Sequence, residues 1–176
     1  TEAQLLAVNK TAVIMSNVSE LSLEQASNDL VGTMNAFNIK AEESIHIVDA
    51  LNEVDNNYAV STMQLSGALS KAGATAKTFG LTMEEVLGHT TAIGAVTMES
   101  GDIIGNSLKT IYSRITTMQP SIDILDSVGV SIRQMGENGM EMRNVGDILG
   151  DLSGKWGDLS AEQQQNIGVT IAGRNQ

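Results

Sequence analysis

Apolar residues recur at the spacing of an α-helix along most of this chain. The clearest example lies between residues 100 and 117, where the apolar positions share one face: Ile104, Leu108, Ile111 and Ile115. The opposite face of the same segment is polar. We therefore expect an amphipathic helix here, with its apolar stripe turned towards the protein core.

Capping residues mark where several helices begin. In a Ser/Thr-x-x-Glu/Gln box, the first and last side chains each accept a hydrogen bond from the backbone N–H of the other residue. Three such boxes open segments with helical spacing: Ser22 with Gln25, Thr82 with Glu85, and Ser160 with Gln163. The first two boxes stand about 60 residues apart and precede similar patterns, so a duplicated two-helix unit is one alternative.

Glycine and proline indicate where other helices end or begin. Gly80 follows an apolar stripe at the position where a left-handed C-terminal cap is expected. We expect Gly94 to end the helix that begins at Thr82. Pro120 suits the first turn of a short helix, for which Gly129 is the expected stop.

Three further helices carry apolar stripes that we expect to face the core. One follows Ser22, the next comes after a short break, and the third lies towards the C-terminal end of the chain. Their expected inward residues are, in this order, Leu23, Ala26, Leu30, Met34 and Phe37; Ile47, Leu51, Val54 and Tyr58; and Ile148, Leu149, Leu152 and Trp156. A first helix, from about residue 2 to 18, shows the weakest periodicity.

Residues 132–143 alternate between apolar and polar and do not follow a helical period. Within them, Asn138 and Gly139 are expected to supply the two positive-φ positions of a tight turn, which predicts a small β-hairpin. The fold class predicted for the whole chain is mainly α. We expect a compact multi-helix domain of about seven to eight short helices with this one hairpin.

Composition and charge narrow the range of functions. Ten Lys and Arg stand against 21 Asp and Glu, and the formal net charge of −11 disfavours binding to the phosphates of DNA or RNA. The longest apolar runs are a few residues, whereas a membrane-spanning helix needs about 20. The absence of cysteine excludes disulfides, thiolate metal sites and cysteine nucleophiles. Because the sequence lacks an initiator Met, a signal peptide and a final helix stop, we expect it to be a piece of a longer protein.

Residues of catalytic types do not form a recognisable motif. The two histidines, His46 and His89, have no ligand partner at position i+4 of their helices, and we expect both to be structural. The acidic pairs at 42–43 and 84–85 lie in first helical turns, where the helix dipole favours carboxylates. The sequence contains neither a nucleophile elbow nor a phosphate-binding glycine loop. We therefore predict no catalytic, cofactor or metal site and no enzyme activity.

Several short segments follow one another in a characteristic order. Residues 79–85 read Phe-Gly-Leu-Thr-Met-Glu-Glu, and the segments 94–101 and 105–114 come after them. The later members of the series are Leu125 with 128–130, Asn138 with Gly139, 142–145, 147–149, Trp156 and 171–176. Over about residues 20–176, this order and spacing resemble the core region of tail tape-measure proteins of bacteriophages and prophages.

The resemblance implies that residues 20–176 form a single structural domain of a longer tail protein. Such a protein helps to template assembly of the tail tube, sets tail length and later takes part in genome delivery. Its place would be the virion tail, after assembly in the bacterial host cytoplasm. The implied partners are the tail tube protein, tail-tip or baseplate proteins, tail assembly chaperones and further copies of the full-length protein. Residues 1–20 would form a helix that could lead in from an upstream coiled coil.

The same resemblance implies a set of residues that hold the fold and carry no chemistry. Gly94 and Gly105 would let their helices turn and approach closely, and Arg114 would flank the apolar stripe. The full set is Gly80, Thr82, Glu85, Gly94, Gly105, Arg114, Asn138, Gly139, Arg143 and Trp156.

Methionine replaces the leucine that is usual in the family at four positions: Met83, Met98, Met140 and Met142. Core filling is the expected use of these side chains, and an adaptable contact surface is the alternative.

Two other functions stay open at this point. Some tape-measure proteins carry peptidoglycan-cleaving domains, and such an enzyme module would need an acid carboxylate in an apolar pocket. A bacterial helical adaptor domain is the other alternative.

Overall fold

The computed structural model describes residues 1–173, which form nine α-helices and one two-stranded antiparallel hairpin. The predicted fold class, mainly α with a single hairpin, is confirmed. The α-helices are α1 (Glu2–Val18), α2 (Leu23–Phe37), α3 (Ile45–Asn57), α4 (Thr62–Thr78), α5 (Met83–Thr97), α6 (Gly101–Thr117), α7 (Gln119–Ser127), α8 (Val145–Lys155) and α9 (Ala161–Ala172). The strands are β1 (Arg133–Gly136) and β2 (Gly139–Met142), and two 3-10 helices are η1 (Ala41–Glu43) and η2 (Trp156–Asp158).

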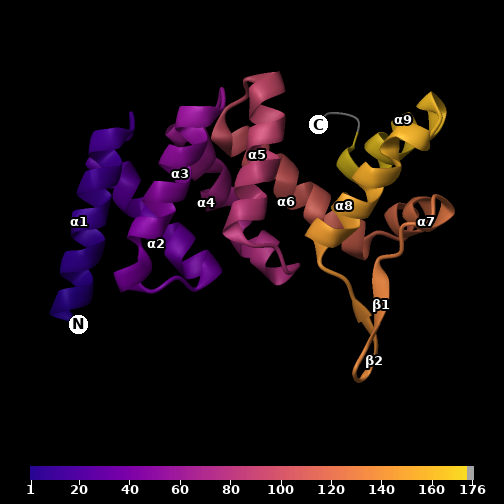
Figure 1. The fold of residues 1–176 in the computed structure, drawn as a ribbon, viewed down its shortest axis with the longest axis horizontal. Coiled ribbons are helices and arrows are strands. Elements are labelled where there is room, and N and C mark those ends of the chain that lie inside the picture. Colours follow the sequence, from indigo (N-terminus) through magenta and orange to yellow (C-terminus); the bar gives the residue numbers. More distant parts are fainter. Residues whose placement is uncertain (174–176) are drawn as a thin grey trace.

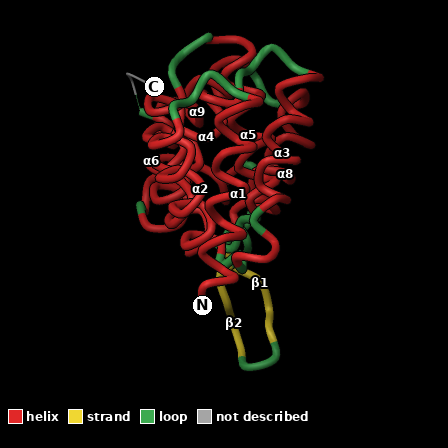
Figure 2. The backbone as a smooth tube through the Cα atoms, turned by 90° about the vertical axis from the view of Figure 1, so that its left-hand side faces the viewer, coloured by secondary structure: helices red, strands yellow, loops and turns green. Residues whose placement is uncertain are grey.

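The helices stand in a row along the longest axis of the molecule, from α1 at one end to α7 and α9 at the other (Figure 1). Two helices make most of the contacts between elements: α4 contacts α2, α3 and α5, whereas α6 contacts α5, α7, α8 and α9. The pair α4 and α6 pack against each other and so join the two groups. The hairpin projects away from the helices, as the end-on view also shows (Figure 2).

The predicted helix starts are confirmed. Capping boxes are present at Ser22, Thr82 and Ser160, and at Thr82 the backbone N–H donates to Glu85 Oε2 at 2.7 Å. Two further boxes, at Thr1 and Ser61, have the same sequence form but were not identified from the sequence. Each box satisfies backbone N–H groups that an isolated helix start leaves without partners.

One hydrophobic cluster extends from Ala12 and Met15 of α1 to Ile171 of α9. In α6 the predicted stripe is buried except at Ile111, which is half-buried. Tyr112, which lies beside that stripe, is fully buried and was not expected in the core.

Three residues predicted to face the core are instead exposed. Leu23 is 50% exposed at the first position of α2, beside the cap. Tyr58 is 61% exposed because it is the extended C-cap residue of α3, where the helical period no longer applies. Trp156 is 38% exposed because α8 ends at Lys155 and Trp156 begins η2, which turns with a tighter period.

Gly94 does not end its helix, so that prediction is wrong. The helix α5 continues to Thr97 and ends with Met98 in the left-handed conformation, at φ 55°. Gly94 is buried inside α5, where a Cβ atom would lie 3.3 Å from both methyl groups of Val60 and 3.4 Å from Ile104 Cδ1. Its missing side chain therefore serves close packing and not helix termination.

Two glycines bring the backbones of α4 and α6 together. A Cβ atom at Gly105 would lie 2.7 Å from the carbonyl oxygen of Ala68, and one at Gly101 would overlap the carbonyl oxygen of Gln64. Neither contacted atom belongs to a side chain that could rotate away. The junction between the two groups of helices therefore depends on the absence of side chains at these positions.

The hairpin lies where it was predicted, but its turn differs. Gly136 pairs with Gly139, so the two loop residues are Glu137 and Asn138. Gly139 has a φ of 120°, whereas Asn138 is not among the residues with positive φ. The expected pair of positive-φ residues is thus wrong, since the turn places this conformation at the first residue of β2 only.

Candidate interaction surfaces

Ionisable side chains do not converge anywhere in the described chain as they would in a metal centre. Within residues 1–173, no group of three or more His, Cys, Asp or Glu side chains could hold a metal ion. None of the helices in this range is both long and apolar enough to cross a membrane.

His89 and Tyr112 form a polar contact between α5 and α6. The Nδ1 atom of His89 lies 2.8 Å from the hydroxyl of Tyr112. Burial lowers the pKa of His89 below its ordinary value, and the charge of Glu85 opposes this shift. Burial also raises the pKa of the Tyr112 hydroxyl. The pair therefore ties two core helices together in neutral form.

Asp29 makes a similar contact between α2 and α4. The hydroxyl of Ser66 donates to Asp29 Oδ2 at 2.9 Å, and burial raises the pKa of this carboxyl group. Because Asp29 faces a hydroxyl of the neighbouring helix and is not among the residues lining the apolar grooves, its geometry fits a tie between helices and not a general acid.

Three of the four methionines that were expected in the core are exposed. Met83 is buried, but Met98 is 81% exposed, Met140 is 61% exposed and Met142 is 47% exposed. In the hairpin, Met135 pairs with Met140, and Arg133 pairs with Met142. Side chains alternate between the faces of a strand, so the three hairpin methionines share one solvent-facing side. The contact-surface alternative describes these side chains better than core filling does.

Hydrogen bonds fix the base of the hairpin to the helices. The guanidinium of Arg143 donates to the backbone oxygen of Ser131 at 2.8 Å and to Asp151 Oδ2 at 2.7 Å. The next residue, Asn144, donates to the backbone oxygen of Gly80 at 2.7 Å and caps α8 through Gly146 N–H. The start of α8 is thus joined to the loop that precedes α5.

Several of the proposed fold-holding residues lie near this contact between the start of α8 and the loop before α5. Gly80 has a φ of 86°, and its neighbours Thr82 and Glu85 form the capping box of α5. Asn144 reaches the backbone oxygen of Gly80 from the hairpin side, whereas the preceding residue, Arg143, bonds to Ser131 and Asp151. The remaining members lie apart: Gly94 and Gly105 in helix contacts, Asn138 and Gly139 in the turn, Arg114 beside Gly173, and Trp156 in η2.

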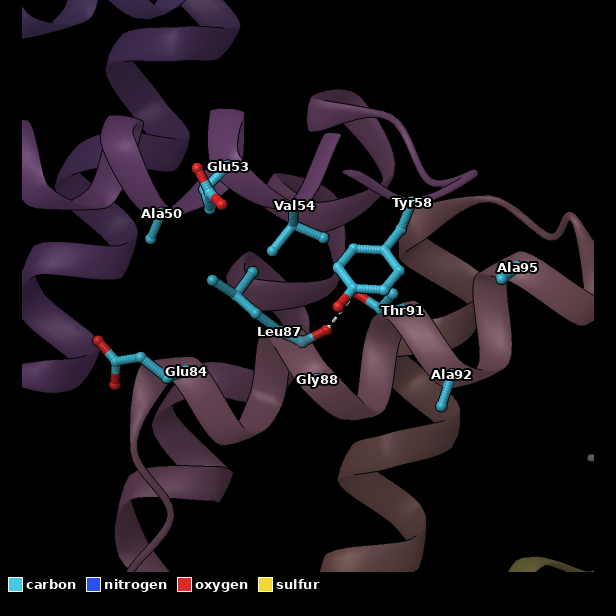
Figure 3. A pocket seen from close by; sticks show the side chains of 10 residues that line it. All are labelled: Ala50, Glu53, Val54, Tyr58, Glu84, Leu87, Gly88, Thr91, Ala92 and Ala95. Atoms are coloured by element: carbon cyan, nitrogen blue, oxygen red, sulfur yellow. Dashed lines mark hydrogen bonds between the residues drawn. The ribbon is translucent and has the colours of Figure 1, made fainter. Parts of the chain in front are cut away.

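A groove of about 610 Å³ runs between α3 and α5 on the surface (Figure 3). The chain at α3 contributes Ala50, Glu53, Val54 and Tyr58. The opposite wall, on α5, consists of Glu84, Leu87, Gly88, Thr91, Ala92 and Ala95. We call this feature the α3–α5 groove. Sequence reasoning did not find it, although Gly88, Ala92 and Ala95 recur at helical spacing and could have signalled an unusually thin helix face.

Comparison with known proteins gives a consistent assignment. The family model described as phage-related minor tail protein matches residues 1–173. A probable tape measure protein of Halomonas phage phiHAP-1 is 25% identical over 109 residues, which cover 60% of this chain and 12% of that protein. No solved structure matches the chain. The resemblance identified from the sequence is thereby confirmed, and the chain belongs to the phage-related minor tail protein family.

Proposed function

We propose that this chain is a structural module of a tape-measure protein and acts in the virion tail. In this role it helps to template the tail tube, to set tail length and later to deliver the genome. The observation that carries the proposal is the family match over residues 1–173, together with the likeness to a probable tape measure protein. The relative's much greater length supports the view that the module is one folded domain of a longer polypeptide.

The physical basis of such a ruler is the rise of about 1.5 Å per residue along an α-helix. A long helical polypeptide can therefore fix the length of a tube that is built around it. The chain folds into a row of packed helices and not into one long helix (Figure 1), so its proposed role is to provide contacts at one point along the tail.

Exposed apolar surface supports a contact role. The hairpin methionines and the α3–α5 groove both face solvent, and such surfaces on a folded domain commonly bind partners. The proposed partners are the tail tube protein, tail-tip or baseplate proteins, tail assembly chaperones and other copies of the full-length protein. We further propose that assembly takes place in the bacterial host cytoplasm and that residues 20–176 act as a single domain.

The module is proposed to act without catalysis. His89 contacts Tyr112, and Asp29 contacts Ser66, so these half-buried side chains already serve contacts between helices. The purified chain, added to peptidoglycan in a clearing assay, should leave the substrate intact. Clearing of the cell-wall material would instead support the peptidoglycan-cleaving alternative.

The length of the encoded polypeptide tests directly whether this protein can set tail length. We expect the reading frame that contains this chain to be many hundreds of residues long. Its length at about 1.5 Å per residue should approach the tail length in electron micrographs of the particle. A frame that ends near residue 176, or a particle without a tail, would favour a helical adaptor domain.

A further inference from the structure

The α3–α5 groove has the features of a helix-binding groove. Its α5 wall carries Gly88, Ala92 and Ala95, whose small side chains leave the helix backbone accessible along one face. Val54 and Leu87 supply the apolar floor between the two walls (Figure 3). From Glu84 to Ala95 the wall extends about 16 Å at the helical rise. A partner helix of roughly three turns would fill this length.

The surface of α5 at Gly88 is open to an incoming side chain. A Cβ atom at Gly88 would meet nothing within 4 Å, so the space above the backbone is open. Packed helices approach to about 8–10 Å between axes, and small residues at the contact permit the closer end of that range. The missing side chain at Gly88 would therefore let an incoming helix approach α5 closely at this point.

The two ends of the groove differ in chemistry. Glu53 and Glu84 stand at one end, and the ring of Tyr58 stands at the other (Figure 3). Neither glutamate forms an ion pair with any residue in the range 1–173, and Glu53 Oε1 accepts a hydrogen bond from Asn57 Nδ2 at 2.9 Å. Tyr58 is 61% exposed, and exposed aromatic rings are frequent anchors in protein interfaces. A partner that matches both ends carries positive charge beside the glutamates and apolar groups beside the tyrosine.

We propose that the α3–α5 groove binds an amphipathic helix of a partner protein, with Lys or Arg at the end that lies against Glu53 and Glu84. This inference deepens the proposed assembly function by naming the chemistry of one partner, and it rests on that function only for placing the partner in the tail. The peptide experiment below tests the groove on the isolated chain. Failure there leaves the tail-length measurement as an independent test of the function.

The probe is a fluorescent helical peptide of about 16 residues, with Leu and Ala on one face and Lys at one end. A second peptide carries Glu in place of every Lys. Binding to the 176-residue chain is followed by fluorescence anisotropy at several salt concentrations. Because the net charge of −11 attracts any basic peptide, affinity for the unaltered chain is not sufficient, and variants must locate the site.

The first variant, Gly88→Leu, fills the groove with a side chain. Leucine favours a helix, and the open space at Gly88 should let the variant keep its fold. Gly32→Leu is the matched control, because Gly32 also lies in an exposed helix position with nothing within 4 Å of its Cβ site. We expect Gly88→Leu to weaken binding of the Lys peptide by about tenfold or more, and Gly32→Leu to change it by less than about twofold.

The second variant reverses the charge of the groove through Glu53→Lys and Glu84→Lys. Its control combines Glu24→Lys with Glu137→Lys, which changes the net charge equally. Glu24 also matches Glu84 in position, since each is exposed in the first turn of a capped helix. The groove variant should prefer the Glu peptide, whereas the control should keep the preference of the unaltered chain for the Lys peptide.

The outcomes separate the possible occupants. Loss of Lys-peptide binding in Gly88→Leu, together with exchanged preference in the charge variant, supports the proposal. Equal binding by all variants, or failure of the unaltered chain to bind the Lys peptide, would overturn it. Self-association of the unaltered chain in sedimentation that Gly88→Leu abolishes would also overturn it, because a second copy would then occupy the groove.

Discussion

Replacement of Gly105 by alanine should damage the junction between the two groups of helices. The new Cβ atom would lie 2.7 Å from the carbonyl oxygen of Ala68 and 2.9 Å from its Cα atom. Both are backbone atoms of α4, so the clash can be relieved only by moving one helix against the other. That movement would loosen the contact on which the core between α4 and α6 depends.

The size of the effect follows from two opposing contributions. Overpacking of a tight core contact typically costs about 1–3 kcal/mol. Alanine is also a better helix former than glycine by about 1 kcal/mol, and this gain hides part of the cost. Gly88→Ala supplies the matched control, because Gly88 is also helical but has open space at its Cβ position. The two variants should therefore differ in free energy of unfolding by about 1–3 kcal/mol.

Urea unfolding followed by the helical circular dichroism signal measures this difference. With a slope of about 2 kcal/mol per molar urea, the midpoint of Gly105→Ala should fall roughly 0.5–1.5 M below that of Gly88→Ala. Equal midpoints for the two variants would instead mean that the backbones of α4 and α6 are not in close contact at Gly105.

Three further predictions concern single contacts. Thr82→Ala removes the N-cap of α5 and should lower the free energy of unfolding by about 1 kcal/mol in urea titration, whereas no loss would show that the cap is dispensable. Arg143→Met keeps the aliphatic stem but loses the bonds to Ser131 and Asp151, so amide hydrogen exchange in the hairpin should accelerate; unchanged exchange would count against this anchor. His89 has a lowered pKa in the folded state, so stability should fall as pH drops below about 6.5 and the unfolded chain takes up a proton first. If the NMR resonance of the His89 ring titrated above that pH, the predicted effect of burial on the His89 pKa would be contradicted.

Helix starts and the most regular apolar stripe could be predicted because both are local. A capping box needs only residues three apart, and Thr82 with Glu85 forms it as expected. The stripe of α6 likewise follows from the helical period alone, and Ile104 and Ile115 are fully buried. The hairpin was recognisable because strand alternation differs from helical spacing over 132–143.

The wrong predictions concern residues at helix ends and residues whose environment is set by another element. Tyr58 and Trp156 continue the apolar pattern beyond the last helical residue, so periodicity assigned them to the wrong side. Glycine is a residue type that often ends helices, which is why Gly94 was predicted to do so. Its neighbours Val60 and Ile104 instead require a small residue inside the helix. These outcomes depend on contacts between elements, which a local pattern does not contain.

The candidate binding surface could not be predicted from the local sequence pattern either. The α3–α5 groove combines side chains from two helices, and only the fold sets the distance between their walls. The exposed methionines are a related case, because the sequence allowed either core filling or surface contact. The projection of the hairpin from the helices decides between the two for Met140 and Met142 (Figure 2).

An in-frame deletion of residues 1–173 from the phage or prophage gene shows whether the tail requires this chain, with tails examined by electron microscopy and infectivity measured in parallel. If the chain is a structural part of the tail that the whole assembly requires, the deletion should yield no infectious tails. Normal tails of normal length after the deletion would contradict this central claim.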